Sequence, residues 1–242
     1  MTILVGMVGS DGIVFAADEL MVRQAPHAAE YDDRVLIQKI QHSAQHHVAF
    51  AGVGDHATRQ VEQEFLSALD QSCFDFKNVK RSLEHITRDT IRKIRTKAEQ
   101  DYSAEEGRRI AFDQHLPRAL LIVFYGDQLP ERQLWSVCIQ DAPAVVQITG
   151  CRVNGGLGNL CRFFADYYRP GTPVSSLKHL AAYTVLAASR FDSLMIGGLE
   201  LAVIDGNGFR LISENEKAAL RQGYDDFDAM VRSQLLPRPD SQ

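Results

Sequence analysis

No stretch of this sequence is apolar for long enough to cross a lipid bilayer, which takes about 18–20 consecutive apolar residues. Its N-terminal apolar run also lacks the basic leader of a secretory signal peptide, so we expect a cytoplasmic protein without a membrane partner. An excess of positive charge is missing too. The 26 Lys and Arg against 31 Asp and Glu give a net charge of −5, which gives no reason to expect nucleic acid as a partner.

The chain is also poor in the side chains that hold cofactors. Its four cysteines have no metal or redox spacing, and we expect free, mostly buried thiols. Its eight histidines contain no clear ligand motif, and the glycines of residues 155–158 fit neither a dinucleotide-binding nor a phosphate-binding loop. We therefore expect neither a metal nor an organic cofactor. What is present is 45% apolar residues over 242, enough to bury a large core as one domain or two.

A threonine stands directly behind the initiator methionine. Removal of Met1 would leave Thr2 with a hydroxyl and a free α-amine, and such an amine titrates near ~7.7–8.0 and can act as a base. A threonine hydroxyl activated by its own terminal amine is a recognised nucleophile. Many chains begin Met-Thr without catalytic meaning, so the interpretation depends on the residues around Thr2.

Those residues predict a buried β-hairpin. Residues 3–8 and 13–18 are almost continuously apolar, and Asp11-Gly12 lies between them. Two apolar runs joined by Asp-Gly are typical of a hairpin, and continuous apolar runs indicate that both of its faces are buried. Stiff strands would hold Thr2 at the edge of a sheet and Asp18 at the end of the neighbouring strand, where a carboxylate could fix a cation.

With Lys39 in Leu-Ile-Gln-Lys-Ile and Gly52 in Ala-Gly, the chain resembles the proteasome β-subunit family of N-terminal nucleophile hydrolases. The resemblance implies that Thr2 is the nucleophile, that Asp18 and Lys39 are catalytic, and that the Gly52 amide forms the oxyanion hole. Positive charge at Lys39 would favour the ionised hydroxyl, and glycine lets an oxyanion approach its amide closely. Taken singly, Lys39 also suits a surface lysine and Asp18 a turn cap; their order and context favour catalysis.

The resemblance further implies helper residues near the terminal amine. They fall on Asn154, where the family usually has serine, and on Asp192, where Met195 replaces a serine three residues on unless Ser193 substitutes for it. An asparagine can donate to or accept from an amine, so Thr2 could still be oriented. Asn154 could equally cap a following helix, and one residue could serve both purposes.

Two substrate-binding residues follow from the same resemblance, Phe50 and Met21. Phe50 lies two residues before the oxyanion glycine, at the floor of the specificity pocket in the family. An aromatic side chain there suggests a restricted pocket that prefers small side chains.

Periodicity and turn signals predict a mixed chain with antiparallel sheets, an α+β fold. The resemblance implies the four-layer αββα sandwich of the N-terminal nucleophile hydrolases, spanning 2–213, with 214–242 as a helical C-terminal extension and tail. The predicted strands are 2–8, 12–18, 35–40, 46–51, 119–125, 133–139, 144–148, 199–204 and 209–211. The predicted helices are 56–69, 78–97, 156–168, 176–190 and 214–235, with a loop at 99–117.

The helix at 78–97 carries many Lys and Arg on its polar face. A solvated basic face is the favoured interpretation, and a surface that meets an acidic neighbour in a ring or a regulatory partner is the alternative.

The function that the resemblance implies is a threonine-type peptidase in a self-compartmentalised ring of identical subunits, acting on peptides or proteins, with an ATP-dependent unfoldase as a candidate partner. The chain length suggests a bacterial proteasome-like group, either the beta-proteobacterial proteasome homologue, which we favour, or the Anbu group. Two alternatives stay open: an amidohydrolase that acts on a small amide, and a non-catalytic ring or scaffold protein.

Overall fold

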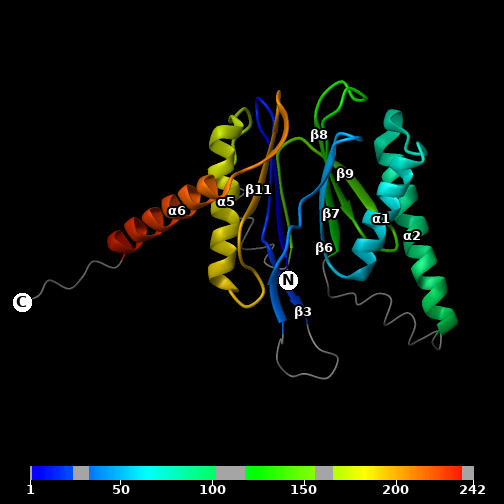
Figure 1. Ribbon diagram of the computed structural model, residues 1–242, viewed down its shortest axis with the longest axis horizontal. Coiled ribbons are helices and arrows are strands. Elements are labelled where there is room, and N and C mark those ends of the chain that lie inside the picture. The colour runs from blue at the N-terminus through cyan, green and yellow to red at the C-terminus, as the bar shows by residue number, and fades with distance from the viewer. Residues whose placement is uncertain (1, 24–32, 102–117, 156–165, 236–242) are drawn as a thin grey trace, which may run out of the picture.

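The computed structural model describes residues 2–23, 33–101, 118–155 and 166–235. Within these ranges the chain is a mixed helix-and-sheet protein with four α-helices and twelve strands (Figure 1). Two five-stranded antiparallel sheets form its centre, and a two-stranded ribbon lies beside them.

The first sheet has the strand order β10-β1-β2-β11-β12 and contains the predicted hairpin. Its strands are β1 (Ile3–Val8), β2 (Ile13–Ala17), β10 (Cys151–Gly155), β11 (Glu200–Asp205) and β12 (Gly208–Leu211). The hairpin pairs Leu4 with Ala17 and Val8 with Ile13. Every residue of β2 is buried, which confirms that both faces of the hairpin are covered.

The second sheet has the order β5-β6-β7-β8-β9. Its strands are β5 (Gln41–Ser43), β6 (Val48–Val53), β7 (Ala119–Phe124), β8 (Gln133–Cys138) and β9 (Ala144–Ile148). The separate ribbon pairs β3 (Leu20–Arg23) with β4 (Asp33–Leu36) and continues directly from the end of β2.

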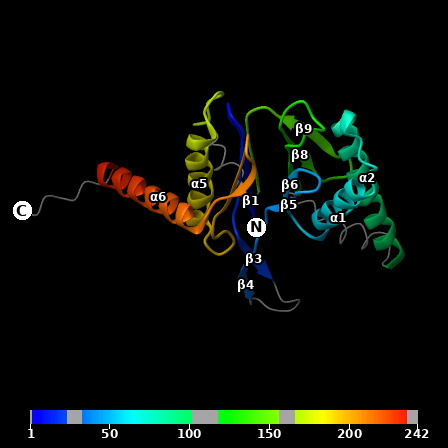
Figure 2. The ribbon, with the colours of Figure 1, turned by 45° about the horizontal axis from the view of Figure 1, so that its top comes forward.

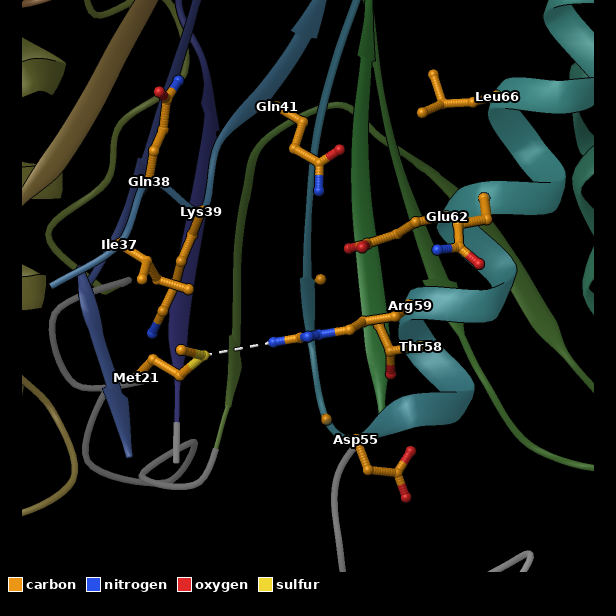
Figure 3. Close-up of a pocket in the computed structure, with 13 residues that line it drawn as sticks. Met21, Ile37, Gln38, Lys39, Gln41, Asp55, Thr58, Arg59, Glu62 and Leu66 are labelled. Atoms are coloured by element: carbon orange, nitrogen blue, oxygen red, sulfur yellow. Dashed lines mark hydrogen bonds between the residues drawn. The ribbon is translucent and has the colours of Figure 1, made fainter. Parts of the chain in front are cut away.

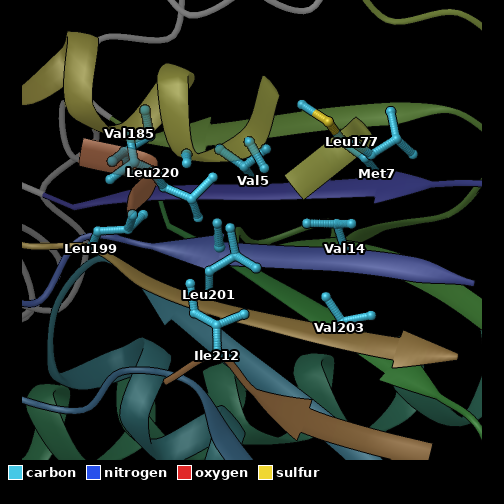
Figure 4. Close-up of a cluster of buried hydrophobic side chains, with 14 of the residues drawn as sticks. Val5, Met7, Val14, Leu177, Val185, Leu199, Leu201, Val203, Ile212 and Leu220 are labelled. Atoms are coloured by element: carbon cyan, nitrogen blue, oxygen red, sulfur yellow. The ribbon is translucent and has the colours of Figure 1, made fainter. Parts of the chain in front are cut away.

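Helices cover the outer face of each sheet. Helix α5 (Val174–Phe191) packs on the first sheet, where Val5 and Met7 of β1 meet Leu177 and Val185 (Figure 4). The second sheet is covered by α1 (His56–Asp70) and α2 (Val79–Asp101), with a 3₁₀ turn at Phe76–Asn78 before α2.

The inner faces of the two sheets pack against each other. Leu4 and Phe15 of the first sheet lie in one buried cluster with Ala51 and Leu121 of the second. Side chains alternate between the two faces of a strand, so the continuous apolar runs of β1 and β2 supply this inner layer as well as the face beneath α5. Full burial of one such Val, Leu or Phe side chain is worth about 1.5–3 kcal/mol.

Helix α6 (Glu214–Leu235) leaves the body of the protein (Figure 2). Near its start, Leu220 and Tyr224 are buried against the α5 side of the fold. One and two turns further on, Phe227 and Met230 are 45% and 47% exposed. Phe227 packs edge-on against Tyr183 of α5, so the apolar stripe of α6 is covered only in part.

Several sequence expectations need correction. Residues 35–40 are not one strand: β4 ends at Leu36, and 37–40 have no regular structure. The strand β10 was not expected, and of the helix predicted over 156–168 the described residues 166–168 are not helical, while 156–165 lie outside the described ranges. Cys73 is exposed rather than buried.

The remaining predicted elements lie within a few residues of observed ones. The expected loop at 99–117 begins later, because α2 extends to Asp101, and 102–117 lie outside the described residues. Among the described residues, Lys80, Lys93 and Arg95 of α2 are paired with Glu84, Glu64 and Asp141 respectively. In the part of the chain that the structure describes, no helix is long and apolar enough to cross a membrane.

Candidate active site

The first residues of β1, the end of β2 and the segment after β4 meet at one end of the first sheet. There the ammonium group of Lys39 donates to the hydroxyl Oγ1 of Thr2 at 3.0 Å and to the carboxylate Oδ2 of Asp18 at 2.8 Å. Three residues far apart in the sequence are thus joined by one cation. The structure brings together Thr2, which the sequence proposed as the nucleophile, and its two proposed catalytic partners, Asp18 and Lys39.

Asp18 is held by the hairpin itself. Its Oδ1 accepts the backbone N–H of Ile3 at 2.9 Å, and its own N–H donates to the carbonyl of Ile3 at 3.3 Å. The side chain is fully buried, and this burial raises the pKa of Asp18, while the charge and the hydrogen bond of Lys39 oppose the rise.

Burial acts on Lys39 in the opposite direction. Desolvation lowers the pKa of the Lys39 ammonium from its ordinary value, and the charge and hydrogen bond of Asp18 oppose the shift. The charged form is therefore less favoured than in a surface lysine.

A second carboxylate, Glu200, fixes the backbone of the lysine segment. Its Oε2 accepts the N–H of Lys39 at 2.7 Å and the N–H of Ile40 at 2.9 Å, and the residue is only 3% exposed. Burial raises the pKa of Glu200, and these two backbone donors oppose the rise. Sequence reasoning missed Glu200, although a lone acidic residue inside the apolar run Leu199–Ile204 was the available signal.

A further contact links this end of the sheet to helix α6. Glu19 follows Asp18, and its carboxylate accepts from Lys217 of α6 at 2.7 Å and from the N–H of Leu199 at 3.0 Å. Although burial alone would lower it, hydrogen bonds and charges of Glu19 and Glu214 hold the pKa of Lys217 above its ordinary value. The base of α6 is therefore tied to the residue beside the site.

Beside Lys39 lies a cavity of about 360 Å³ between the 37–41 segment, β6 and α1 (Figure 3). Gly52 and Met21 both line it, as the sequence expected of residues near a substrate. Strand β5 pairs with β6 only from Val48 to Phe50, so Gly52 lies past the end of that pairing, on the open side of β6. Met21 accepts a contact of 3.4 Å at its sulfur from the guanidinium of Arg59.

Close backbone packing also holds Ile3, the residue after Thr2. Gly155 pairs with Ile3 across the sheet and has a φ of +134°, and a Cβ built on it would lie 2.1 Å from the carbonyl oxygen of Thr2. Only glycine suits this position, since a side chain would meet backbone in a conformation that L-residues rarely adopt.

Three other predicted site residues lie elsewhere or have other partners. The amide of Asn154 accepts from Arg152 at 2.9 Å and donates to Ser136 at 3.4 Å. Asp192 ends α5 and accepts the N–H of Met195 at 3.2 Å. Phe50 is 1% exposed and packs edge-to-face on Phe65 in the core beneath α1 and α2, rather than at the surface of the cavity.

Comparison with known proteins finds solved structures of similar fold but no matching sequence family. No protein-family model matches the chain, and no curated protein matches it. Among solved structures, it is similar over 100% of both chains to an Anbu mutant from Hyphomicrobium sp. strain MC1, with a TM-score of 0.67 and 15% identity.

Two further Anbu structures are similar in the same way. Anbu, an ancestral β-subunit, from Yersinia bercovieri has a TM-score of 0.64 at 16% identity over 99% of both chains. The helical assembly of the Anbu complex from Pseudomonas aeruginosa has a TM-score of 0.68 at 16% identity, over 99% of this chain and 98% of that one. These likenesses support the Anbu-like alternative rather than the group favoured from the sequence. The chain has the proteasome-like fold of the Anbu proteins.

Proposed function

We propose that this protein is an N-terminal-threonine peptidase with the four-layer αββα sandwich of the N-terminal nucleophile hydrolases over residues 2–213. The observation that carries the proposal is the position of the Lys39 ammonium, within hydrogen-bonding distance of both the Thr2 hydroxyl and the Asp18 carboxylate. An ordinary surface lysine at a strand end would have no reason to be buried against these two groups. The fold shared with the Anbu proteins is consistent with the same chemistry.

The reaction would begin once Met1 is removed. Oγ1 of Thr2 attacks the carbonyl carbon of the substrate, and its proton passes to the free α-amine of Thr2. Lys39 favours the ionised hydroxyl through its charge, and Asp18 holds Lys39 in place. The N–H of Gly52 donates to the oxyanion, an interaction whose loss typically costs about a hundred- to a thousand-fold in rate.

The intermediate then breaks down in two steps. The C–N bond breaks, the proton goes to the departing amine, and the acyl group stays on Thr2 as an ester. Water attacks this ester, which releases the carboxylic acid and restores the hydroxyl. These steps need only side chains, backbone and water. The helper roles of Asn154 and Asp192 remain predictions, because their observed partners are other residues.

We further propose that the subunits assemble with one another into a self-compartmentalised particle in the cytoplasm. One of the similar structures is a helical assembly of its own complex. In this chain, the apolar side chains Phe227 and Met230 of α6 are 45% and 47% exposed, in the proposed extension 214–242. Light scattering of the purified protein gives the test, because an assembly would run at many times the 27.0 kDa of one chain. Peptide or protein substrates and an unfoldase partner belong to the same proposal.

Intact mass spectrometry tests the catalytic proposal. The protein is weighed before and after treatment with a peptide epoxyketone, which reacts with a hydroxyl and an amine on one residue. We expect loss of Met1 followed by a single adduct, and no adduct on the Thr2→Ala variant. Retention of Met1 with no adduct would refute the proposal and favour the scaffold alternative. An adduct on a single 27.0 kDa chain that cleaves only small amides would favour the amidohydrolase.

A further inference from the structure

An acidic side chain from α1 points into the cavity beside the site. The carboxylate of Glu62 projects from the helix toward β6 (Figure 3). A Cβ built on Gly52 would lie 2.2 Å from Oε1 of Glu62, so the carboxylate occupies the space where a side chain at Gly52 would stand. A substrate whose carbonyl reaches the Gly52 amide would therefore place its nearest side chain against Glu62.

This carboxylate is buried and has no partner. Glu62 is only 8% exposed, and among the described residues no hydrogen bond or ion pair reaches its oxygens, whose remaining exposure is to the cavity. Burial raises the pKa of Glu62 to about 7, while the charge of Arg59 lowers it. Buried acidic side chains are nearly always paired, since an isolated carboxylate loses its hydration without compensation. A partner that arrives with the substrate would supply that compensation.

The other charged groups around the cavity do not fill this role. Lys39 is committed to Thr2 and Asp18, and Asp55 is paired with Arg118 at the start of α1. Arg59, one turn before Glu62, reaches across the cavity instead and donates to the sulfur of Met21 (Figure 3).

A thioether is a weak acceptor, so the contact of Arg59 with Met21 is easily exchanged for water. The inner wall of the cavity thus presents one unpaired carboxylate behind a movable cation.

We infer that Glu62 is a specificity-determining residue, and that the cavity takes a substrate side chain bearing a cation, the ammonium of lysine or the guanidinium of arginine. The inference rests on the proposed function, because it assigns the cavity to the residue whose carbonyl Thr2 attacks. It replaces the sequence-based expectation of a pocket restricted to small side chains by Phe50, whose ring packs into the core.

The inference is tested by equilibrium binding, which does not require catalysis. Two peptide amides are compared by calorimetry on the full chain, identical except for lysine or norleucine at the C-terminal residue. We expect the lysine peptide to bind about 10- to 100-fold more tightly at pH 8, since an otherwise unpaired buried carboxylate gains a partner. The Glu62→Gln variant should bind the two peptides equally.

A matched control comes from the same helix. Glu64 is exposed and pairs with Lys93 on α2, so Glu64→Gln removes the same charge outside the cavity and should keep the preference. The preference should also rise from pH 5.5 to pH 8 as Glu62 loses its proton. Lys39, Arg59 and Asp55 also line the cavity, and the Glu62→Gln variant keeps all three, so the rise should be absent from that variant.

The inference is overturned if the wild type binds the two peptides equally, binds the norleucine peptide more tightly, or binds neither measurably. It is also overturned if the preference for the lysine peptide survives Glu62→Gln. Cleavage of the same peptides is measured separately. A Glu62-dependent preference without cleavage would leave the inference standing and refute the peptidase proposal. Cleavage without the preference would overturn the inference and leave the peptidase proposal standing.

Discussion

Replacement of Lys39 by methionine should destabilise the fold mainly through Asp18. The variant keeps most of the buried aliphatic chain and removes the ammonium, so Asp18 retains only the N–H of Ile3 as a hydrogen-bond donor. Removing one partner of a buried ion pair typically costs about 3–5 kcal/mol. The loss of stability has an upper limit, because Asp18 can take up a proton instead of staying charged. Protonating a carboxyl of ordinary pKa at pH 7 costs about 4 kcal/mol, at 1.36 kcal/mol per pH unit. Since Lys39 is itself desolvated, we expect a net loss of about 2–4 kcal/mol.

The sign of the pH dependence follows from the same group. In Lys39→Met, the folded-state pKa of Asp18 lies further above its unfolded value, so the folded state binds the extra proton. The penalty is therefore small below the unfolded pKa and grows as the pH rises toward the folded one. We expect a loss at pH 7 that shrinks to about 1 kcal/mol near pH 4.5.

Urea denaturation at one protein concentration measures both values, with the concentration fixed because assembly adds its own stabilisation. The matched control is the double variant Lys39→Met/Asp18→Asn. An amide at position 18 can still accept the N–H of Ile3 and carries no charge, so most of the lost stability should return. A loss below 1 kcal/mol at pH 7, an equal loss at both pH values, or no recovery in the double variant would refute this account of the site.

Three more outcomes are expected. Burial raises the pKa of Glu62 to about 7 from an ordinary 4.5, so its contribution to stability is greatest below pH 4.5 and falls as the pH rises to 7. In urea titrations, Glu62→Gln should be as stable as the wild type at pH 4.5 and more stable by up to about 3 kcal/mol at pH 8. Gly155→Ala should lower the free energy of unfolding by about 2–3 kcal/mol or prevent folding, whereas Gly223→Ala in α6, where nothing lies near the added methyl group, should raise it by about 0.5–1 kcal/mol. Glu200→Leu leaves two buried N–H groups without an acceptor and should lower the free energy of unfolding by about 2–4 kcal/mol. By displacing Lys39 it should also slow epoxyketone addition about a hundred-fold, while Glu200→Gln, which keeps one acceptor, should lose less stability and less reactivity.

The parts of the fold that were predictable are those with local signals. The hairpin of β1 and β2 follows from two apolar runs around Asp-Gly, and α1 begins at Asp55, whose carboxylate accepts the N–H of Ala57 as an N-cap should. Thr2, Asp18 and Lys39 could be named together because their order and surroundings resemble those of the proteasome β-subunit family. Their contact is observed, and their catalytic role remains a prediction.

Other parts depend on contacts that no local pattern contains. Strand β10 pairs with β1 across some 150 residues, and the apolar–polar alternation of its sequence Cys-Arg-Val-Asn-Gly lasts only four residues before a glycine, which is a weak local signal. Phe50 illustrates the second difficulty. Its place two residues before Gly52 gives the face of β6 on which it lies, but whether that face meets solvent or helix is decided by α1, where Phe65 covers it.

The strand predicted at 35–40 fails for a reason that bears on the site itself. Lys39 and Ile40 donate their N–H groups to one buried carboxylate of Glu200 instead of to a neighbouring strand. Glu200 stands opposite Ala17 in the β2–β11 pair, and Ala17 precedes Asp18. The same two strands therefore fix both ends of Lys39, its backbone through Glu200 and its ammonium through Asp18. In a regular strand, the direction of a lysine side chain would follow from the pleat of the sheet. Here the position of Lys39 is set by Asp18 and Glu200, two acidic side chains that are costly to bury. That cost is hard to explain by stability alone and is expected where a cation has to be aimed at a hydroxyl.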